Sequence, residues 1–476
     1  MQLRKVKFVF YDYETFGLIP ALDKPIQFSC VITDYNLNII SSNICFFCKP
    51  PIDYLPNIES IFVTKISPLD LLKKDCLNEY FFTKNIHNIF VKKNICITGY
   101  NNFKFDDEFT RNIFYRNFFD PYSWHWKNNN SRLDILVMLR AYYSFRPENI
   151  IWPVIKKYNI VSFKLSKFTK SNNILHKKAH DAIDDVYATL YVAKFLKNKN
   201  KKLFNYIFKI RLKKNVINVI KRNFGKPMLY SSNIFGVTKF NLSTVFFLFF
   251  YPNNSNIAIM LDLSKDLKIL FHYICKSYRT SLEIKTLIRL GVLFVYLNRL
   301  PVLAPFSVAR KEDLCRMKID VLNKKAKIKY IKSKFKIFSF IKTCMLFKKN
   351  IVKNSIDVDL KIYEKFTNYK DKKLMNIIHS IDIKKISKLK ILFCDNRMNE
   401  LFFRLKARNF ICSLNMLEKK KWKRHCIKIF SKKFLVKYVE DLKYNLYKFW
   451  FDKDKVILIK KVFIYIKYIL YKINNY

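Results

Sequence analysis

Three runs near the start of the chain have the pattern of buried strands. Residues 6–11 are almost wholly apolar and aromatic up to Asp12, and 25–33 and 38–48 are further runs rich in Ile, Val, Phe and Cys. Continuous apolar runs of this length, bounded by turn residues, predict strands covered on both faces. Their close spacing predicts an antiparallel meander.

Helical and strand patterns then alternate up to residue 198. Helices are expected from Ser67-Pro68, a serine cap followed by proline at the first helical position, and over 79–91, 109–118, 133–144 and 181–197. Residues 94–98 form a short buried strand between two of these helices. Strand, loop and helix in this order predict an α/β domain over 1–198, and the charged run 198–202 marks its end.

Two further domains are expected after that run. Short strands at 228–231, 244–251, 257–263 and 292–296, with a helical piece near 282–290, predict a small β-rich barrel or sandwich over 199–350. Helical patterns dominate 351–476, which we interpret as an all-α C-terminal domain, and 456–471 is an amphipathic helix that packs on the rest of the chain.

The apolar runs and the cysteines exclude several classes of protein. Runs such as 244–251 are far shorter than the ~20 residues that span a bilayer, so we expect no membrane partner. No secretory pattern precedes Asp12, and of the eleven cysteines only Cys45 and Cys48 form a C-x-x-C, which we interpret as buried thiols. A reducing, cytoplasmic setting follows.

The charge points to a polyanionic partner. The chain holds 90 Lys and Arg against 36 Asp and Glu, a formal net charge of +54, for which nucleic acid is the simplest partner. Residues 1–200 hold 28 basic and 18 acidic residues, whereas 201–476 hold 62 and 18. Half of the carboxylates therefore lie where metal ligands would be needed.

Asp12 and Glu14 end the first strand. Side chains alternate along a strand, so the two carboxylates point to the same side. Buried together they are costly unless a positive charge neutralises them, and hard oxygen ligands suit Mg²⁺ or Mn²⁺. The alternative is a strand end that faces water.

Three more candidate residues follow downstream. Asp106 lies just past a strand, where a helix begins; it is either a catalytic group or a helix cap. Asp181 is a credible N-cap, which places Asp185 in the first turns of the next helix, and His180 lies on the loop before it. A lone histidine is often only structural. Together, however, four carboxylates and one histidine match a two-metal nuclease, with His180 as general base.

These segments carry a family resemblance. Residues 10–15, 102–106 and 180–185 resemble the three motifs of the His-containing branch of the Asp-Glu-Asp-Asp 3′→5′ exonucleases. Residues 99–102, 111–118, 226–227, 301–304 and 407–410 are similar to the bacterial exodeoxyribonuclease I family, so the resemblance covers nearly the whole chain.

The resemblance implies a fold and an activity. The fold is a ribonuclease H-like exonuclease domain (1–198), an SH3-like domain (199–350) and a helical C-terminal domain (351–476). The activity is 3′→5′ degradation of single-stranded DNA to 5′-mononucleotides in DNA repair and recombination, with two Mg²⁺ ions for which Mn²⁺ substitutes. The implied partners are single-stranded DNA and the acidic tail of single-stranded-DNA-binding protein, with the enzyme a monomer.

The resemblance also implies which residues of this sequence form the site, by their positions in the matching motifs. The implied metal ligands are Asp12, Glu14, Asp106 and Asp185, and the implied base is His180. The implied substrate contacts are Glu14, Lys164, where the family has arginine, and Arg111, Tyr122, Trp126 and Arg140. Two alternatives remain: an exoribonuclease of the same superfamily, and a nucleic-acid-binding protein whose site has decayed.

Overall fold

A computed structural model describes residues 5–73, 76–177, 181–276, 283–318, 320–334, 341–342, 355, 357–389 and 391–475. The chain divides into two compact units. The first comprises Met1–Asn130, Lys177–Tyr187 and Val352–Tyr476, and the second comprises Ser131–His176 and Ala188–Ile351.

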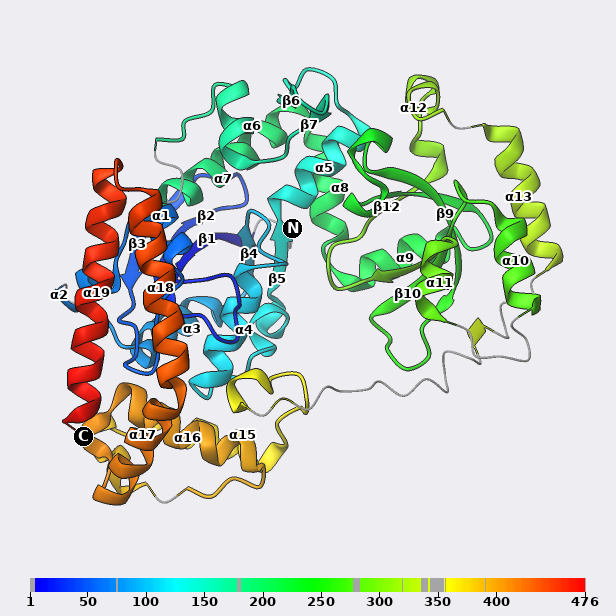
Figure 1. The fold of residues 1–476 in the computed structure, drawn as a ribbon. Coiled ribbons are helices and arrows are strands. Elements are labelled where there is room, and N and C mark those ends of the chain that lie inside the picture. The colour runs from blue at the N-terminus through cyan, green and yellow to red at the C-terminus, as the bar shows by residue number, and fades with distance from the viewer. Residues whose placement is uncertain are drawn as a thin grey trace. The chain divides into compact units, whose positions relative to one another are not determined.

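A mixed sheet lies at the centre of the first unit. Its strands are β1 (Lys7–Thr15), β2 (Pro25–Thr33), β3 (Ile39–Phe47) and β4 (Ile95–Gly99), and they run in the order β3-β2-β1-β4 (Figure 1). β1 pairs antiparallel with β2 and parallel with β4, and β2 pairs antiparallel with β3. The predicted meander is confirmed.

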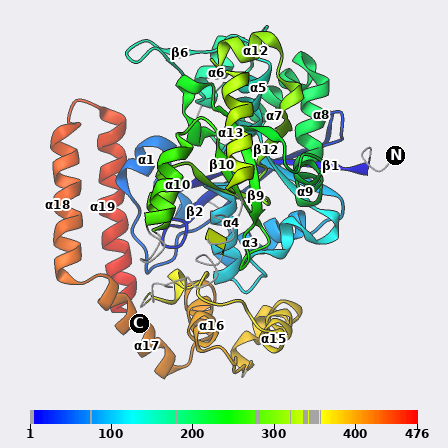
Figure 2. The same ribbon diagram turned by 90° about the vertical axis from the view of Figure 1, so that its right-hand side faces the viewer.

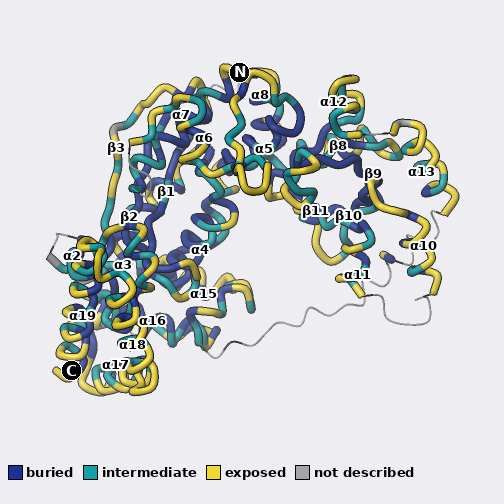
Figure 3. Tube along the Cα trace, turned by 45° about the horizontal axis from the view of Figure 1, so that its top comes forward, coloured by how far each residue is buried: buried dark blue, intermediate teal, exposed yellow. Residues whose placement is uncertain are grey.

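Four helices of the first 130 residues accompany this sheet: α1 (Ile58–Thr64), α2 (Pro68–Lys73), α3 (Glu79–Phe90) and α4 (Asp106–Arg116). Tyr11 and Tyr13 of β1 are buried in one apolar cluster with Phe82 of α3 and Phe109 of α4. Because successive side chains alternate between faces, this packing directs Asp12 and Glu14 to the opposite face of the strand. Figure 3 shows the buried run of β1.

The C-terminal helices belong to the same unit and pack against its N-terminal part. They are α15 (Tyr369–Ser380), α16 (Asn396–Asn409), α17 (Met416–Ile429), α18 (Lys432–Lys448) and α19 (Lys453–Asn474). α18 and α19 lie side by side as an antiparallel pair (Figure 2). Ile459 and Val462 of α19 are buried in one cluster with Phe16 and with Ile61 of α1, which confirms the predicted packing helix.

The second unit contains an antiparallel sheet of its own. Its strands run in the order β11-β10-β9-β8-β12: β8 (Pro227–Ser231), β9 (Leu242–Phe250), β10 (Ile257–Asp262), β11 (Val292–Tyr296) and β12 (Val302–Pro305). The four predicted strands are all present. β12 was not predicted, because four residues with a proline give too short a pattern.

Helices make up most of the rest of the second unit. They are α5 (Ile135–Phe145), α6 (Leu165–Ser171), α8 (Lys201–Ile210), α9 (Lys213–Arg222), α10 (Leu267–Lys276), α11 (Ile284–Arg289), α12 (Lys311–Arg316) and α13 (Val321–Ser333); the short strands β5 (Ser131–Asp134), β6 (Val154–Ile155) and β7 (Ile160–Val161) complete it. α7 (Ala182–Lys199) begins in the first unit and continues into the second. The helical piece expected near 282–290 is α11, whereas α8, α9, α10, α12 and α13 were not predicted from the sequence.

Two smaller expectations concern cysteines and membranes. Cys48 is buried as expected, but Cys45 is exposed, so the expectation of two buried thiols is wrong for Cys45. Among the described helices, none has both the length and the apolar run required to cross a bilayer.

Candidate active site

Asp12 and Glu14 lie in the last part of β1, past the point where its pairing with β4 ends. The last pair between β1 and β4 joins Phe10 to Thr98, whereas pairing with β2 continues to Thr15. The end of β1 is therefore open towards the carboxyl end of β4. Crevices at the carboxyl ends of strands are where α/β sheets place their functional groups.

The start of α4 fills part of this opening. The backbone N–H of Tyr13, between the two carboxylates of β1, donates a hydrogen bond to Oδ1 of Asp106 at 3.3 Å. The N-cap of α4 is Phe105, which makes no side-chain cap bond. Asp106 is therefore the first helical residue rather than the cap, and its buried carboxylate is fixed against β1.

The next residue, Asp107, has a different environment. Its Oδ1 accepts hydrogen bonds from the Tyr11 hydroxyl at 2.6 Å and from the Asn102 amide at 3.2 Å. Asp107 is fully buried and does not line the pocket described below. Its carboxylate stabilises the packing of α4 against β1.

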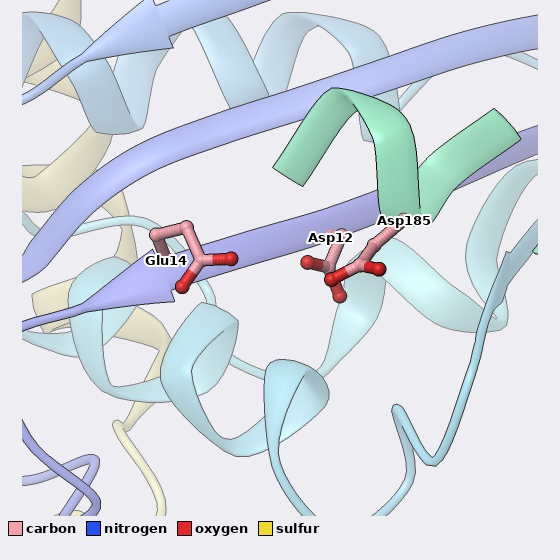
Figure 4. A group of neighbouring side chains, drawn as sticks. All are labelled: Asp12, Glu14 and Asp185. Carbon is pink, nitrogen blue, oxygen red and sulfur yellow. The ribbon is translucent and has the colours of Figure 1, made fainter. Parts of the chain in front are cut away.

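Asp185 approaches from α7. The side chain of Asp181 accepts from the Ile183 N–H at 3.3 Å, and the Asp185 N–H donates to the Asp181 carbonyl at 3.0 Å. Asp181 thus caps the helix, as predicted, and Asp185 lies in its first turn. Carboxylate oxygens of Asp12, Glu14 and Asp185 all lie within 4.8 Å of one another (Figure 4).

These carboxylates share a pocket of about 390 Å³. Asp12, Glu14, Asp106, Asp185 and Glu59 of α1 line it, and among the described residues of its lining there is no lysine or arginine. A volume of this order accommodates a small ligand. Five carboxylates gathered in one pocket supply the hard oxygen ligands that a divalent cation prefers.

The electrostatics agree with that donor set. Burial, followed by the charges of Asp106, Asp185 and Glu14, raises the pKa of Asp12 well above its usual value. Burial and then Asp185, Asp106 and Asp181 raise the pKa of Glu14 to about 8. Without a cation, the cluster therefore retains protons at neutral pH, and a bound cation would favour the ionised form.

The other predicted site residues are placed as follows. His180 lies outside the described residues. Arg111 is buried and paired with Glu108, which also accepts from the Tyr363 hydroxyl. The Tyr122 hydroxyl donates to the Ile362 carbonyl at 3.2 Å, and Trp126 is 63% exposed.

Two predicted substrate contacts belong to the second unit. The Arg140 guanidinium lies 5.7 Å from the centre of the Phe163 ring. Lys164 is exposed and occupies the N-cap position of α6. Both are basic side chains, the kind that most often contacts phosphates in nucleic-acid complexes.

Sequence reasoning missed part of the pocket wall. Glu59, Ser60 and Thr64 come from α1, a helix of seven residues that is too short for a periodic signal. Asn101 was seen only as part of a loop; its positive φ of 64° marks the sharp turn that brings the loop to the pocket.

Comparison with known protein families identifies three matching regions. Residues 9–193 match the family model described as Exonuclease, 211–346 match the Exonuclease I SH3-like domain, and 356–469 match the Exonuclease I C-terminal domain. The order of these regions is the order expected from the sequence.

Curated relatives span the whole chain. Exodeoxyribonuclease I of Buchnera aphidicola subsp. Schizaphis graminum is 44% identical over 100% of this chain and 99% of the relative. Exodeoxyribonuclease I of Escherichia coli is 37% identical over 96% of this chain and 97% of the relative.

Solved structures of similar proteins agree with these matches. Escherichia coli exonuclease I in complex with a dA16 oligonucleotide superposes with a TM-score of 0.91 at 36% identity, covering 98% of this chain and all of that one. A complex described as SSB/Exonuclease I with an inhibitor gives 0.88 at 37% identity, covering 98% and 99%. A zinc-bound exonuclease I–ssDNA complex gives 0.88 at 36% identity, covering 98% and 100%.

Proposed function

This chain belongs to the exonuclease I family, and from that premise we propose that it hydrolyses single-stranded DNA from the 3′ end to 5′-mononucleotides. The observation that carries the proposal is the convergence of carboxylate oxygens of Asp12, Glu14 and Asp185 within 4.8 Å, in a pocket that Asp106 and Glu59 also line. The relatives with the same name and the oligonucleotide complexes of a similar protein support the choice of substrate.

The acidic residues of the pocket hold divalent cations. Asp12, Glu14, Asp106 and Asp185 would bind two Mg²⁺ ions, with Mn²⁺ as a substitute; the zinc-bound relative supports a divalent metal. When bound, such ions stabilise the negative charge that develops on the attacking and departing oxygens at phosphorus. The Tyr13 N–H orients Asp106 for this task.

His180 is the proposed general base. It precedes Asp181, the cap of α7, and so lies five residues before the ligand Asp185. There it would accept the proton of the attacking water. The remaining proposed contacts to the strand are Glu14, Arg111, Tyr122, Trp126, Arg140 and Lys164.

Partners and cellular role follow from the same premise. The complex of a similar protein with SSB supports binding of the acidic tail of single-stranded-DNA-binding protein by this chain as well. The formal charge of +54 favours acidic partners of this kind. We place the enzyme in the cytoplasm, as a monomer acting in DNA repair and recombination.

Nucleotide release from a labelled strand tests the proposal. Single-stranded DNA carrying a 3′ label should release labelled 5′-mononucleotide with Mg²⁺, none with EDTA, and far less from the matched RNA. Asp185→Asn should abolish release, whereas Asp184→Asn, at the adjacent position of α7, should retain most of it. Equal release from RNA would favour the exoribonuclease alternative, and no release under any condition would favour a decayed binding protein.

A further inference from the structure

The second unit contains a pocket of its own, separate in sequence from the carboxylate cluster. It has a volume of about 630 Å³ and is lined by residues between 238 and 327, from the start of β9, the turn after β10 and the start of α13. Five of its lining residues are basic: Lys239, Arg316, Lys318, Lys324 and Lys327. Among the described residues of the lining only Asp320 is acidic, so the lining is strongly positive.

Two of these lysines converge on one point. The Nζ atoms of Lys324 and Lys327 donate to the Leu263 carbonyl at 2.9 and 3.0 Å, and Lys327 also donates to the Lys265 carbonyl at 2.9 Å. Neutral carbonyls orient the two ammonium groups but do not balance their charge. Burial and the charge of Lys327 lower the pKa of Lys324 to about 8. An anion at this point would relieve the repulsion.

The nearby acids are engaged elsewhere. Asp262 accepts from the Ser243 hydroxyl at 2.5 Å and from the Ser264 N–H at 2.9 Å, at the edge of the pocket. Asp320 caps α13 by accepting from the Asn323 N–H at 3.0 Å. Both carboxylates attract Lys324 electrostatically, but neither forms an ion pair with it within the part of the chain that the structure describes, and both fix the backbone around the pocket.

An aromatic surface and a buried hydroxyl lie beside these charges. The guanidinium of Arg316 is 4.7 Å from the centre of the Phe240 ring, and its Nη2 donates to the Ser144 carbonyl at 2.6 Å. Phe240, Met317 and Leu263 supply the apolar part of the lining. Thr244 lines the same pocket, is 1% exposed, and its Oγ1 has no hydrogen-bond partner among the described residues.

We propose that this pocket binds a phosphorylated nucleoside. Its phosphate lies among the four lysines, and its base lies against the apolar surface formed by Phe240 and Met317. The volume is within the ~300–1,000 Å³ of small-ligand sites. Aromatic surface next to positive charge is the usual means of holding a nucleotide without reading its sequence. The choice of a nucleoside over other phosphates rests on the proposed function.

A phosphorylated nucleoside can reach this pocket from two sources. The ligand is either a free 5′-mononucleotide, which the proposed reaction releases, or one nucleotide unit of a single strand. Both present a phosphate beside a planar ring. An acidic peptide would balance the charge but would leave the apolar surface without a planar partner.

Calorimetry on the full-length chain tests the pocket. The protein carries Asp12→Asn and the buffer holds EDTA, so that neither turnover nor cation-dependent binding at the carboxylates contributes. The titrants are 2′-deoxyadenosine 5′-monophosphate, an oligo(dT), inorganic phosphate and an acidic peptide. Lys324→Gln with Lys327→Gln should weaken nucleotide or oligonucleotide binding at least tenfold. Lys325→Gln with Lys329→Gln removes the same charge from exposed positions of α13 and should change it less than twofold.

The outcomes separate the sources and the alternatives. Tight binding of the mononucleotide alone identifies a free ligand, and tight binding of the oligonucleotide alone identifies a strand contact. The proposal would be overturned if both double variants lost the same affinity for the nucleotide or oligonucleotide. It would also be overturned if inorganic phosphate bound as tightly as the mononucleotide, or if only the peptide bound. Lys318→Gln, at an exposed lining position, repeats the test if the first double variant does not fold by circular dichroism. Nuclease activity of the unmodified chain is measured separately, so failure of the proposed function is distinguishable.

Discussion

The backbone N–H of Tyr13 donates to Oδ1 of Asp106 across 93 positions of sequence. This bond fixes the carboxylate of a helix start between two carboxylates of a strand end. It explains why Asp106 belongs to the site although Asp107, its neighbour, is bonded to Tyr11 instead.

Asp106 and Asp107 should respond differently to the same substitution. Asp106→Asn keeps an oxygen that accepts from Tyr13 but removes a charge from the cluster, so activity should fall roughly 10²-fold or more while the fold persists. Asp107→Asn weakens a buried charge-assisted bond to the Tyr11 hydroxyl, so the free energy of unfolding should fall by about 1–2 kcal/mol with activity changed only a few-fold. Rates of nucleotide release and urea unfolding curves check both. Matching losses of activity in the two variants would contradict the assignment.

The cation-free protein should lose stability as the pH rises towards 8. The pKa of Glu14 is raised from 4.5 to about 8, so the folded protein binds more protons than the unfolded chain between these values. Stability from this group is complete below pH ~4.5 and is lost as the pH rises through 8. Mg²⁺ should restore it and increase the melting temperature most at the alkaline end. Melting temperatures with EDTA or Mg²⁺ measure this.

Glu14→Gln is the control for that series. It removes both the titrating group and one negative charge, so the cation-free variant should melt at a higher temperature than the unmodified protein near pH 8. Its response to Mg²⁺ should also be smaller. A pH profile that the substitution leaves unchanged would show that another group causes the dependence.

His379 should contribute a dependence of the opposite sign. Its Nε2–H donates to the Phe118 carbonyl at 3.0 Å, its Nδ1 accepts from the Tyr80 hydroxyl at 3.1 Å, and its ring stacks on Phe119 at 3.8 Å. Burial lowers its pKa to about 4. The unfolded chain therefore binds more protons between pH 4 and 6.5, and stability falls as the pH is lowered through this range. His379→Phe keeps the stacked ring but removes the titrating group. Between pH 6.5 and 4, the free energy of unfolding of this variant should therefore fall by up to about 2 kcal/mol less than that of the unmodified protein, as measured by urea unfolding.

Within the first unit, Arg408 should be essential for holding the C-terminal helix α16 against the segment that contains Asp53. Its Nη2 lies 2.8 Å from Asp53 and 2.7 Å from Asp359, and both carboxylates are buried. Arg408→Met leaves two buried charges without this partner and should cost about 3–5 kcal/mol. Arg424→Met, at an exposed position of α17, should cost no more than about 0.5 kcal/mol. Chemical denaturation compares the two, and equal costs would contradict the role of Arg408.

Local sequence determined much of the candidate site. The strand that ends in Asp12 and Glu14, the helix that starts at Asp106 and the cap at Asp181 before Asp185 all follow from patterns within ten or so residues. Four strands of the second unit, β8 to β11, were predicted for the same reason. Hydrophobic periodicity and capping act between near neighbours, so a single sequence reports them.

Only the tertiary structure decided which distant segments meet. Glu59 enters the pocket from a seven-residue helix without a periodic signal, and the segment Lys177–Tyr187 joins a compact unit whose other parts end at Asn130 and resume at Val352. Asp53 and Arg408 are paired across 355 positions. Such contacts depend on which surfaces bury one another when the chain collapses, and that is a property of the whole chain rather than of any window within it.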